Sequence, residues 1–123
     1  MISFDNFIIT DGSPLYSQIV LYIKRGVAAG NICHGDELPS RRVLSALLGV
    51  NPNTVQKAYR LLEEEGLIAS HGGAKSLVTV EGEKADLVRE ELLAGDAQSY
   101  VAAMKRMGVT KEDALALVGQ LWD

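Results

Sequence analysis

Residues 38–62, which read LPSRRVLSALLGVNPNTVQKAYRLL, decide the fold of this 123-residue chain. They contain two helical patterns separated by a short turn. The first pattern follows Ser40, a favourable N-cap residue, and stops at Gly49. The second follows Asn51 and has Pro52 in the first helical position, where the missing N–H group has no intrahelical partner to lose. Two helices joined by so short a turn predict a helix-turn-helix.

Apolar residues recur at helical spacing in both patterns and predict the buried face of each helix. In the first helix we expect four side chains to point inward: Val43, Leu44, Leu47 and Leu48. In the second we expect a buried stripe at positions i, i+3, i+4 and i+7, formed by Val55, Ala58, Tyr59 and Leu62. The glutamates that follow, residues 63–65, predict a solvated surface at the end of this helix.

The segments on either side complete the outline of a winged helix. Residues 14–29 predict an amphipathic helix, and residues 1–13 predict an arm that is either a short strand or an extended segment. Residues 67–70 and 76–80 predict two strands, joined by a glycine-rich turn at residues 71–75. We therefore expect a mainly α-helical fold with a small β-hairpin, the wing, after the helix-turn-helix.

The remaining residues predict a tail of two helices, a long one over about residues 83–107 and a last one after Thr110. We expect a winged helix-turn-helix domain at residues 1–81 and a dimerisation tail at residues 82–123. Two helices of this length cannot bury all their apolar side chains between themselves, so a second subunit is expected to cover them. Packing on the body of the same chain is the alternative. The residues expected at the dimer interface are Leu87, Leu92, Val101, Met104, Leu117, Leu121 and Trp122.

The distribution of charge indicates a face that binds nucleic acid. The chain has a formal net charge of −4, yet residues 38–62 contain no Asp or Glu. The basic residues in this window are Arg41, Arg42, Lys57 and Arg60. A basic window within an acidic protein is expected when one face contacts phosphates and the rest does not.

The helix-turn-helix then predicts which side chains contact DNA. In such a motif the first turn of the second helix enters the major groove, and the first helix crosses the phosphate backbone. Arg41, Arg42 and Arg60 are expected at phosphates, because an arginine fork fits phosphate oxygens. At the wing tip, His71 and Lys75 are expected near the minor groove. The residues expected to read base edges are Asn53, Thr54, Gln56 and Lys57.

Other functions have little support in the residues. The chain has no paired-carboxylate site, nucleophile constellation or phosphate-binding loop, and Cys33, His34 and His71 lack the spacing of metal ligands. We therefore expect neither an enzyme nor a cofactor. No apolar run is long enough for a membrane helix, the first residues do not resemble a signal peptide, and a lone cysteine fits a reducing cytoplasm. A winged-helix module that binds another protein instead of DNA is the alternative. A small-molecule effector is compatible with a DNA-binding regulator, but no pocket for one is evident.

Four motifs carry a resemblance to a known family. The chain contains Pro-Leu-Tyr at residues 14–16, Gly-Asp-Glu-Leu-Pro-Ser-x-Arg at 35–42, Asn-Pro-Asn-Thr-Val at 51–55 and Glu-x-Glu-Gly-Leu-Ile at 63–68. With these motifs in this order, the segment from Pro14 to about Val80 resembles the DNA-binding domain of the GntR family of bacterial regulators. The short two-helix tail resembles that of the YtrA-type subfamily.

The resemblance implies further contacts and a biological role. In the family, the arginine that matches Arg42 contacts DNA, as do the residues that open the second helix and a pair at the wing tip. By this match, DNA contacts are implied for Asn51, Pro52, Asn53, Thr54, Gln56, His71 and Gly72. Some members have arginines where Pro52 and Gln56 stand, so an operator sequence does not transfer. The subfamily implies a homodimer that binds a near-palindromic operator and represses a nearby operon, often one encoding an ABC transporter.

Overall fold

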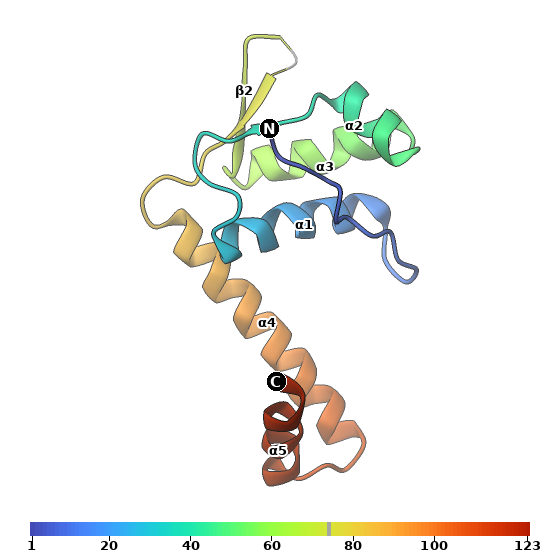
Figure 1. The fold of residues 1–123 in the computed structure, drawn as a ribbon, viewed down its shortest axis with the longest axis vertical. Helices are drawn as coiled ribbons and strands as arrows, with labels where there is room; N and C mark the ends of the chain where they lie inside the picture. The colour runs from blue at the N-terminus through green and yellow to red at the C-terminus, as the bar shows by residue number, and fades with distance from the viewer. Residues whose placement is uncertain (74) are drawn as a thin grey trace. The chain divides into compact units, whose positions relative to one another are not determined.

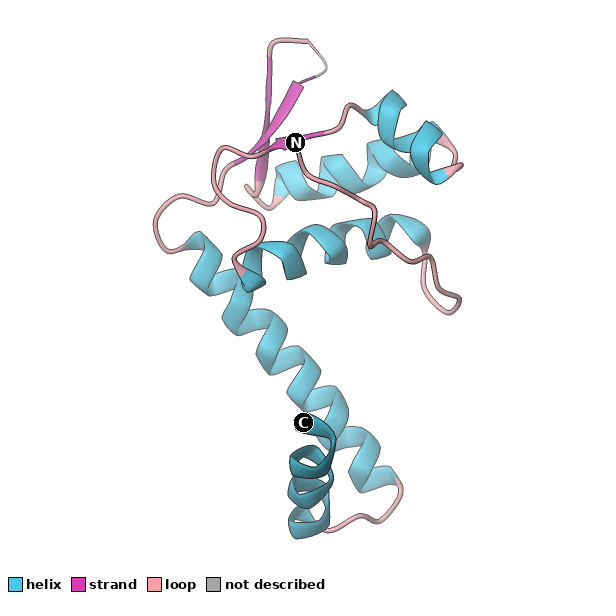
Figure 2. Cartoon of the chain, viewed as in Figure 1, coloured by secondary structure: helices cyan, strands magenta, loops and turns pink. Residues whose placement is uncertain are grey.

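The computed structural model describes residues 1–73 and 75–123 of the chain. The described residues form mostly helices with one small sheet, which confirms the predicted fold class (Figures 1 and 2). In chain order the elements are α1 (Leu15–Ala29), β1 (Glu37–Leu38), α2 (Arg41–Leu48), α3 (Pro52–Glu64), β2 (Ile68–His71), β3 (Lys75–Val78), α4 (Lys84–Arg106) and α5 (Lys111–Trp122).

The chain divides into two compact units, Met1–Arg89 and Glu90–Asp123. The first unit holds the helix-turn-helix, the sheet and the opening turns of α4. The second holds the rest of α4 together with α5. The boundary between the units therefore falls inside α4, whereas the proposed division of the chain into a DNA-binding domain and a tail at residues 81 and 82 stays a prediction.

The core of the first unit is built around α3. Both α1 and α2 pack against α3, and the predicted stripe is confirmed, since Val55, Ala58, Tyr59 and Leu62 are all fully buried. The caps expected from the sequence are present at both helix starts. The Ser40 hydroxyl accepts a hydrogen bond from the Val43 N–H (3.2 Å), and the Asn51 side-chain oxygen accepts one from the Asn53 N–H (2.8 Å).

The predicted inner face of α2 is wrong at two positions. Leu44 is fully buried as expected, but Val43 is 47% exposed and Leu47 is 69% exposed. Since α2 has only eight residues, a narrow strip of its surface reaches the core, and Ser45 next to Leu44 occupies the rest of that strip. The buried hydroxyl of Ser45 finds a hydrogen-bond partner within the helix, since it donates to the Arg42 carbonyl oxygen (2.9 Å). An amphipathic pattern in so short a helix therefore overstates how much of it is buried.

The sheet has three antiparallel strands in the order β1-β3-β2. The wing strands pair with Ile68 opposite Val78 and His71 opposite Lys75, as a hairpin predicts. The strand β1 has only two residues, too few to show an alternating pattern in the sequence. It pairs with β3 through Leu38, which lies opposite Ser76 and is buried.

The N-terminal arm is irregular and packs on α1. Phe4 is buried, and its ring centroid lies 4.8 Å from that of Tyr22. The Ile2 N–H donates to the Glu37 carbonyl oxygen (2.8 Å), and the Tyr22 hydroxyl donates to the Ser3 carbonyl oxygen (2.7 Å). Of the two alternatives for this segment, the structure has the extended one rather than a strand.

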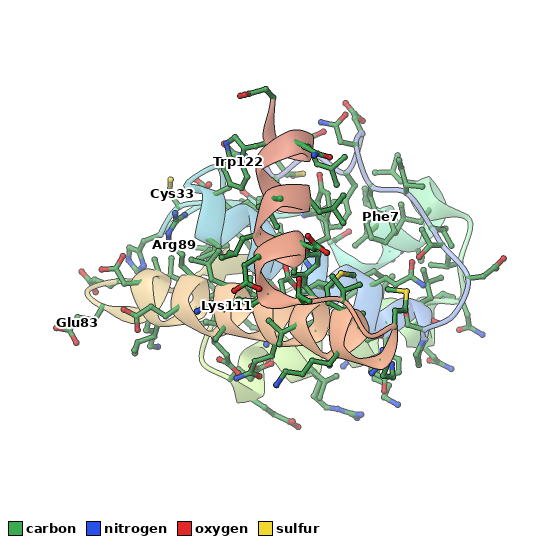
Figure 3. The ribbon with its side chains drawn as sticks, turned by 90° about the horizontal axis from the view of Figure 1, so that it is seen from below. Phe7, Cys33, Glu83, Arg89, Lys111 and Trp122 are labelled. Carbon is green, nitrogen blue, oxygen red and sulfur yellow. The ribbon has the colours of Figure 1, made fainter. Side chains whose placement is uncertain are left out.

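The first turns of α4 are anchored to helix ends within the first unit. The Lys84 ammonium donates to the carbonyl oxygen of Gly66, just after α3 (2.8 Å), and Arg89 donates to that of Ala28 near the end of α1 (2.9 Å; Arg89 is labelled in Figure 3). A helix C-terminus carries partial negative charge and unpaired carbonyl groups, so cations are favoured there. None of the helices in the described ranges combines the length and apolar character needed to cross a membrane.

One buried hydroxyl lies at the centre of the first unit. Tyr59 donates a 2.7 Å hydrogen bond to the carbonyl oxygen of Pro39, which precedes α2. Burial raises the pKa of Tyr59 far above its ordinary value, while the nearby charge of Arg41 lowers it by a smaller amount. The hydroxyl therefore stays protonated and available as a donor at any ordinary pH.

We expect Tyr59→Phe to lower the free energy of unfolding by about 1–3 kcal/mol, because the Pro39 carbonyl would lose its partner in a buried site. Tyr22→Phe is the matched control, since its hydroxyl bond to Ser3 is exposed and its loss should cost less. Urea denaturation monitored by circular dichroism measures both. Equal stability of the two variants would contradict a structural role for the buried bond.

Candidate nucleic-acid interface

The face of α3 opposite its buried stripe carries the side chains expected to read DNA. Asn53, Gln56 and Lys57 are exposed, and Thr54 is half-buried. They lie in the first turns of the helix, directly after the capping residue. Because the stripe is fully buried in the core, this polar face has no freedom to turn inward. It presents amide, hydroxyl and ammonium groups, which match the hydrogen-bonding edges of bases in a major groove.

Two of the three residues implied only by the family resemblance open the helix. Asn51 uses its side-chain oxygen to cap α3, and Pro52 occupies the first turn; both are exposed. The amide nitrogen of the Asn51 side chain makes no hydrogen bond among the described residues. Because the side-chain oxygen of Asn51 caps α3, a DNA contact from Asn51 has to be compatible with this hydrogen bond.

The two adjacent arginines of α2 lie in different surroundings. Arg42 is exposed, and across the described residues its guanidinium takes part in no hydrogen bond or ion pair. Arg41 instead approaches α3, where its Nη2 lies 3.1 Å from Glu63 Oε1 and its guanidinium carbon lies 5.2 Å from the centre of the Tyr59 ring. Arg42 is therefore free to meet a phosphate, whereas Arg41 is already engaged within the protein.

Lys57 is held by a residue that the sequence analysis did not single out. Its Nζ lies 4.0 Å from the centre of the Tyr16 ring, at the start of α1. An ammonium above an aromatic face is attracted by the ring quadrupole, and the contact limits where the flexible lysine side chain can go. Tyr16 belongs to the Pro-Leu-Tyr motif, but nothing in that motif by itself indicates which side chain its ring will meet.

The remaining basic candidates make only weak contacts. Arg60 Nε lies 4.0 Å from Glu64 Oε1, and Lys75 Nζ lies 3.8 Å from Glu37 Oε1. The side chains of Arg60, Glu64 and Lys75 are more than half exposed, and that of Glu37 is 38% exposed. Surface ion pairs of this kind contribute little and exchange readily for another anion. Both cations therefore remain available to phosphates.

The wing turn is exposed and glycine-rich. His71 and Gly72 are exposed, and Gly72 and Gly73 both have positive φ angles (+51° and +68°), a conformation that glycine adopts without strain. Ala74, the next residue of the predicted turn, lies outside the described residues. Because Gly72 and Gly73 have no side chains, their backbone can approach a groove closely.

The residues expected at a dimer interface lie in α4 and α5. Leu92 and Met104 are half-buried, and the other five are exposed. The two largest exposed fractions belong to Leu121, at 74%, and Trp122, at 81%, in the last turn of α5 (Trp122 is labelled in Figure 3). The same segment also carries apolar residues outside this set. Those that are exposed are Leu93, Met107, Leu115 and Val118.

Comparison with known proteins identifies the family. Residues 15–78, about half of the chain, match the family model described as bacterial regulatory proteins, gntR family. The chain belongs to the GntR family. This confirms the resemblance carried by the four sequence motifs, and a regulator of this family binds DNA through its helix-turn-helix.

Individual relatives agree with this assignment. The chain is 31% identical to the uncharacterized HTH-type transcriptional regulator YhcF of Bacillus subtilis, over 83% of this chain and 84% of that protein. It is 38% identical to the HTH-type transcriptional repressor YtrA of Bacillus subtilis, over 65% of this chain and 66% of that protein. A GntR family transcriptional regulator from Listeria monocytogenes has a similar structure, with a TM-score of 0.83 and 31% identity, covering 92% of this chain and 99% of that one. The YtrA-type resemblance is thereby confirmed, and the chain is a GntR-family transcription regulator.

The Tyr16–Lys57 contact predicts an effect of α1 on DNA binding by this GntR-family chain. Tyr16→Leu should weaken binding by about 2- to 5-fold, the range of an exposed cation–π contact, because Lys57 loses the ring that orients it. Tyr16→Phe keeps the ring and should bind like the wild type. Fluorescence anisotropy with labelled DNA measures both. The effect of Tyr16→Leu should vanish in a Lys57→Ala background, and its persistence there would show that Tyr16 acts by another route.

Proposed function

We propose that this GntR-family chain is a homodimeric repressor that reads a near-palindromic operator with the exposed face of α3. The observation that carries the proposal is the division of α3 into two faces. Val55 and Tyr59 are fully buried, while Asn53, Gln56 and Lys57 are exposed on the other side. Exposed amide side chains at the start of a helix that follows a tight turn suit recognition of bases in the major groove.

The proposed contacts fall into two classes. Asn53, Thr54 and Gln56 supply the base contacts that carry sequence information. Phosphate contacts position the protein on the duplex and come from side chains that the protein leaves exposed. Arg42 and Arg60 are proposed at phosphates, Lys57 at a base edge or a phosphate, and His71 and Lys75 at the wing. The DNA contacts of Asn51, Pro52 and Gly72 rest on the family resemblance.

The proposed dimer rests on the apolar surface of α4 and α5. Trp122, Leu121 and Leu115 are exposed large apolar side chains on α5, and a soluble protein rarely leaves so many together uncovered. A two-fold dimer that covers them presents two copies of α3, which suits two half-sites about one helical turn apart on a near-palindrome.

Repression is proposed from the relatives. One of them is named a transcriptional repressor, and a dimer bound across a promoter blocks transcription by occupancy alone. Control of an ABC-transporter operon and release by a small-molecule effector belong to the same proposal and rest on the subfamily resemblance.

The division of DNA contacts makes two variants behave differently. Arg42→Ala should weaken binding about tenfold to operator and random DNA alike, and should reduce the slope of log affinity against log salt by about one. Gln56→Ala should weaken binding to the operator by about 5- to 150-fold with little effect on random DNA or on the slope. Anisotropy titrations with the DNA upstream of the chain's own gene measure these effects.

Two outcomes of these titrations would overturn the proposal. Absence of wild-type binding to the upstream DNA at low salt would rule out autoregulation through that site. Binding that does not change with salt would point to a module for protein partners instead of a DNA-binding regulator.

The proposed dimer predicts that a charge on α5 separates the subunits. Leu121→Lys should weaken dimerisation by at least about 100-fold, because the substitution is present twice in a symmetric interface and each copy loses the burial of a leucine side chain. Gln120→Lys adds the same charge at the neighbouring exposed position and is the control. Sedimentation equilibrium measures the association. A Leu121→Lys variant that stays as dimeric as Gln120→Lys would place the interface elsewhere.

A further inference from the structure

A carboxylate at the end of the recognition helix joins three elements of the first unit. Glu63 Oε1 accepts a hydrogen bond from Arg41 Nη2 in the first turn of α2 (3.1 Å) and another from the Ser70 hydroxyl in β2 (2.8 Å). We call Arg41, Tyr59, Glu63 and Ser70 the Glu63 cluster. The sequence predicts a solvated surface at Glu63. In the structure Glu63 instead lies between the helix that carries Arg42 and the strand that leads to the wing.

The guanidinium of Arg41 is the least solvated basic group of the DNA-binding window. The side chains of Arg41 and Glu63 are only 26% and 35% exposed, and Arg41 Nε is buried without a hydrogen-bond partner among the described residues. The planar group lies over the Tyr59 ring, and Tyr59 in turn donates to the Pro39 carbonyl oxygen. The start of α2 is thus attached to α3 at two neighbouring points, Pro39 and Arg41.

A phosphate contact by Arg41 would compete with this arrangement. To reach DNA, the guanidinium would have to leave the carboxylate, and Glu63 would keep a partly buried negative charge without its cation. Removing one partner of such a pair is unfavourable because the remaining charge is poorly solvated. Arg42 is exposed and has no such pair to break, so the two neighbouring arginines are suited to different tasks.

We propose that Arg41 is a positioning residue, which through Glu63 braces α2 and the wing strand β2 against the recognition helix. It acts on DNA only through the residues it places: Arg42 on one side of the cluster and the wing turn beyond Ser70 on the other. The proposal rests on the DNA contacts proposed for Arg42 and α3, and it replaces the expectation that Arg41 contacts phosphate.

Whether Glu63→Gln raises or lowers the affinity for DNA distinguishes a brace from a phosphate contact. Glu63→Gln removes a negative charge near the interface and releases Arg41 from its ion pair, while the amide oxygen can still accept from Ser70. If Arg41 contacted phosphate, both changes would favour DNA and binding would tighten. If Arg41 is a brace, binding weakens although the protein has become more positive.

The experiment compares Arg41→Met, Glu63→Gln and their double variant with Arg42→Met, a control that removes the same charge one residue along. Binding to the upstream DNA is measured by anisotropy over a series of salt concentrations. We expect Arg41→Met and Glu63→Gln each to weaken binding roughly tenfold with an unchanged salt slope, and the double variant to be no worse than the singles. Arg42→Met should lower the slope by about one. A lowered slope for Arg41→Met, or tighter binding by Glu63→Gln, would overturn the proposal.

A measurement without DNA tests the brace even if the proposed function fails. In ¹H–¹⁵N spectra of the intact protein, Arg41→Met and Glu63→Gln should both shift the backbone amides of Ser70 and His71, whereas Arg42→Met should leave them in place. Glu63→Gln hardly changes the side-chain volume, so its amide shifts still test the brace if the Arg41→Met variant folds poorly. Amide shifts confined to α2 in both variants would overturn the coupling between Arg41 and the wing.

Discussion

The hydrogen bond from the buried Tyr59 hydroxyl to the Pro39 carbonyl oxygen is the contact on which the DNA-binding unit depends. It joins the middle of α3 to the chain immediately before α2, and it does so in a site with no access to water. Helix α2 needs this attachment because it is short and places only Leu44 among its large side chains fully in the core. With α2 attached and the stripe of α3 buried, the polar face of α3 is fixed towards the solvent. The direction in which this polar face points therefore follows from the packing of the core.

The acidic chain presents a basic face because its cations are divided between internal and external positions. Lys24 pairs with Glu65 at 2.7 Å and Arg41 pairs with Glu63, so two of the three glutamates that end α3 are neutralised within the protein. Lys84 and Arg89 are used at helix ends. Arg42, Lys57 and Arg60 remain exposed on the helix-turn-helix itself. The net charge of −4 therefore says little about what the recognition face meets, since the local field depends on which charges are paired.

Much of the fold was predictable because it is encoded by the periodic spacing of residues and by neighbours in the sequence. The stripe of α3, the caps at Ser40 and Asn51 and the wing hairpin all follow from spacing and from local side-chain chemistry. Two features were not predictable for the opposite reason. The strand β1 is two residues long and has no period, and the inner face of α2 depends on which side of a short helix happens to touch α3. Val43 and Leu47 have the correct spacing for burial, but both side chains remain exposed.

The candidate site divides in the same way. The sequence by itself determined that a polar helix face with Asn53 and Gln56 follows a tight turn, that a basic window surrounds it and that four family motifs accompany it, because all of these are local in the chain. Only the tertiary structure decided the surroundings of the individual cations. Arg41 and Arg42 are neighbours of the same type, and they differ because α3 places Glu63 and Tyr59 beside one of them. Lys57 meets Tyr16 from a distant helix. Such pairings depend on how helices pack across the core. A linear pattern of residues carries no information about the distance between side chains that lie far apart in the sequence.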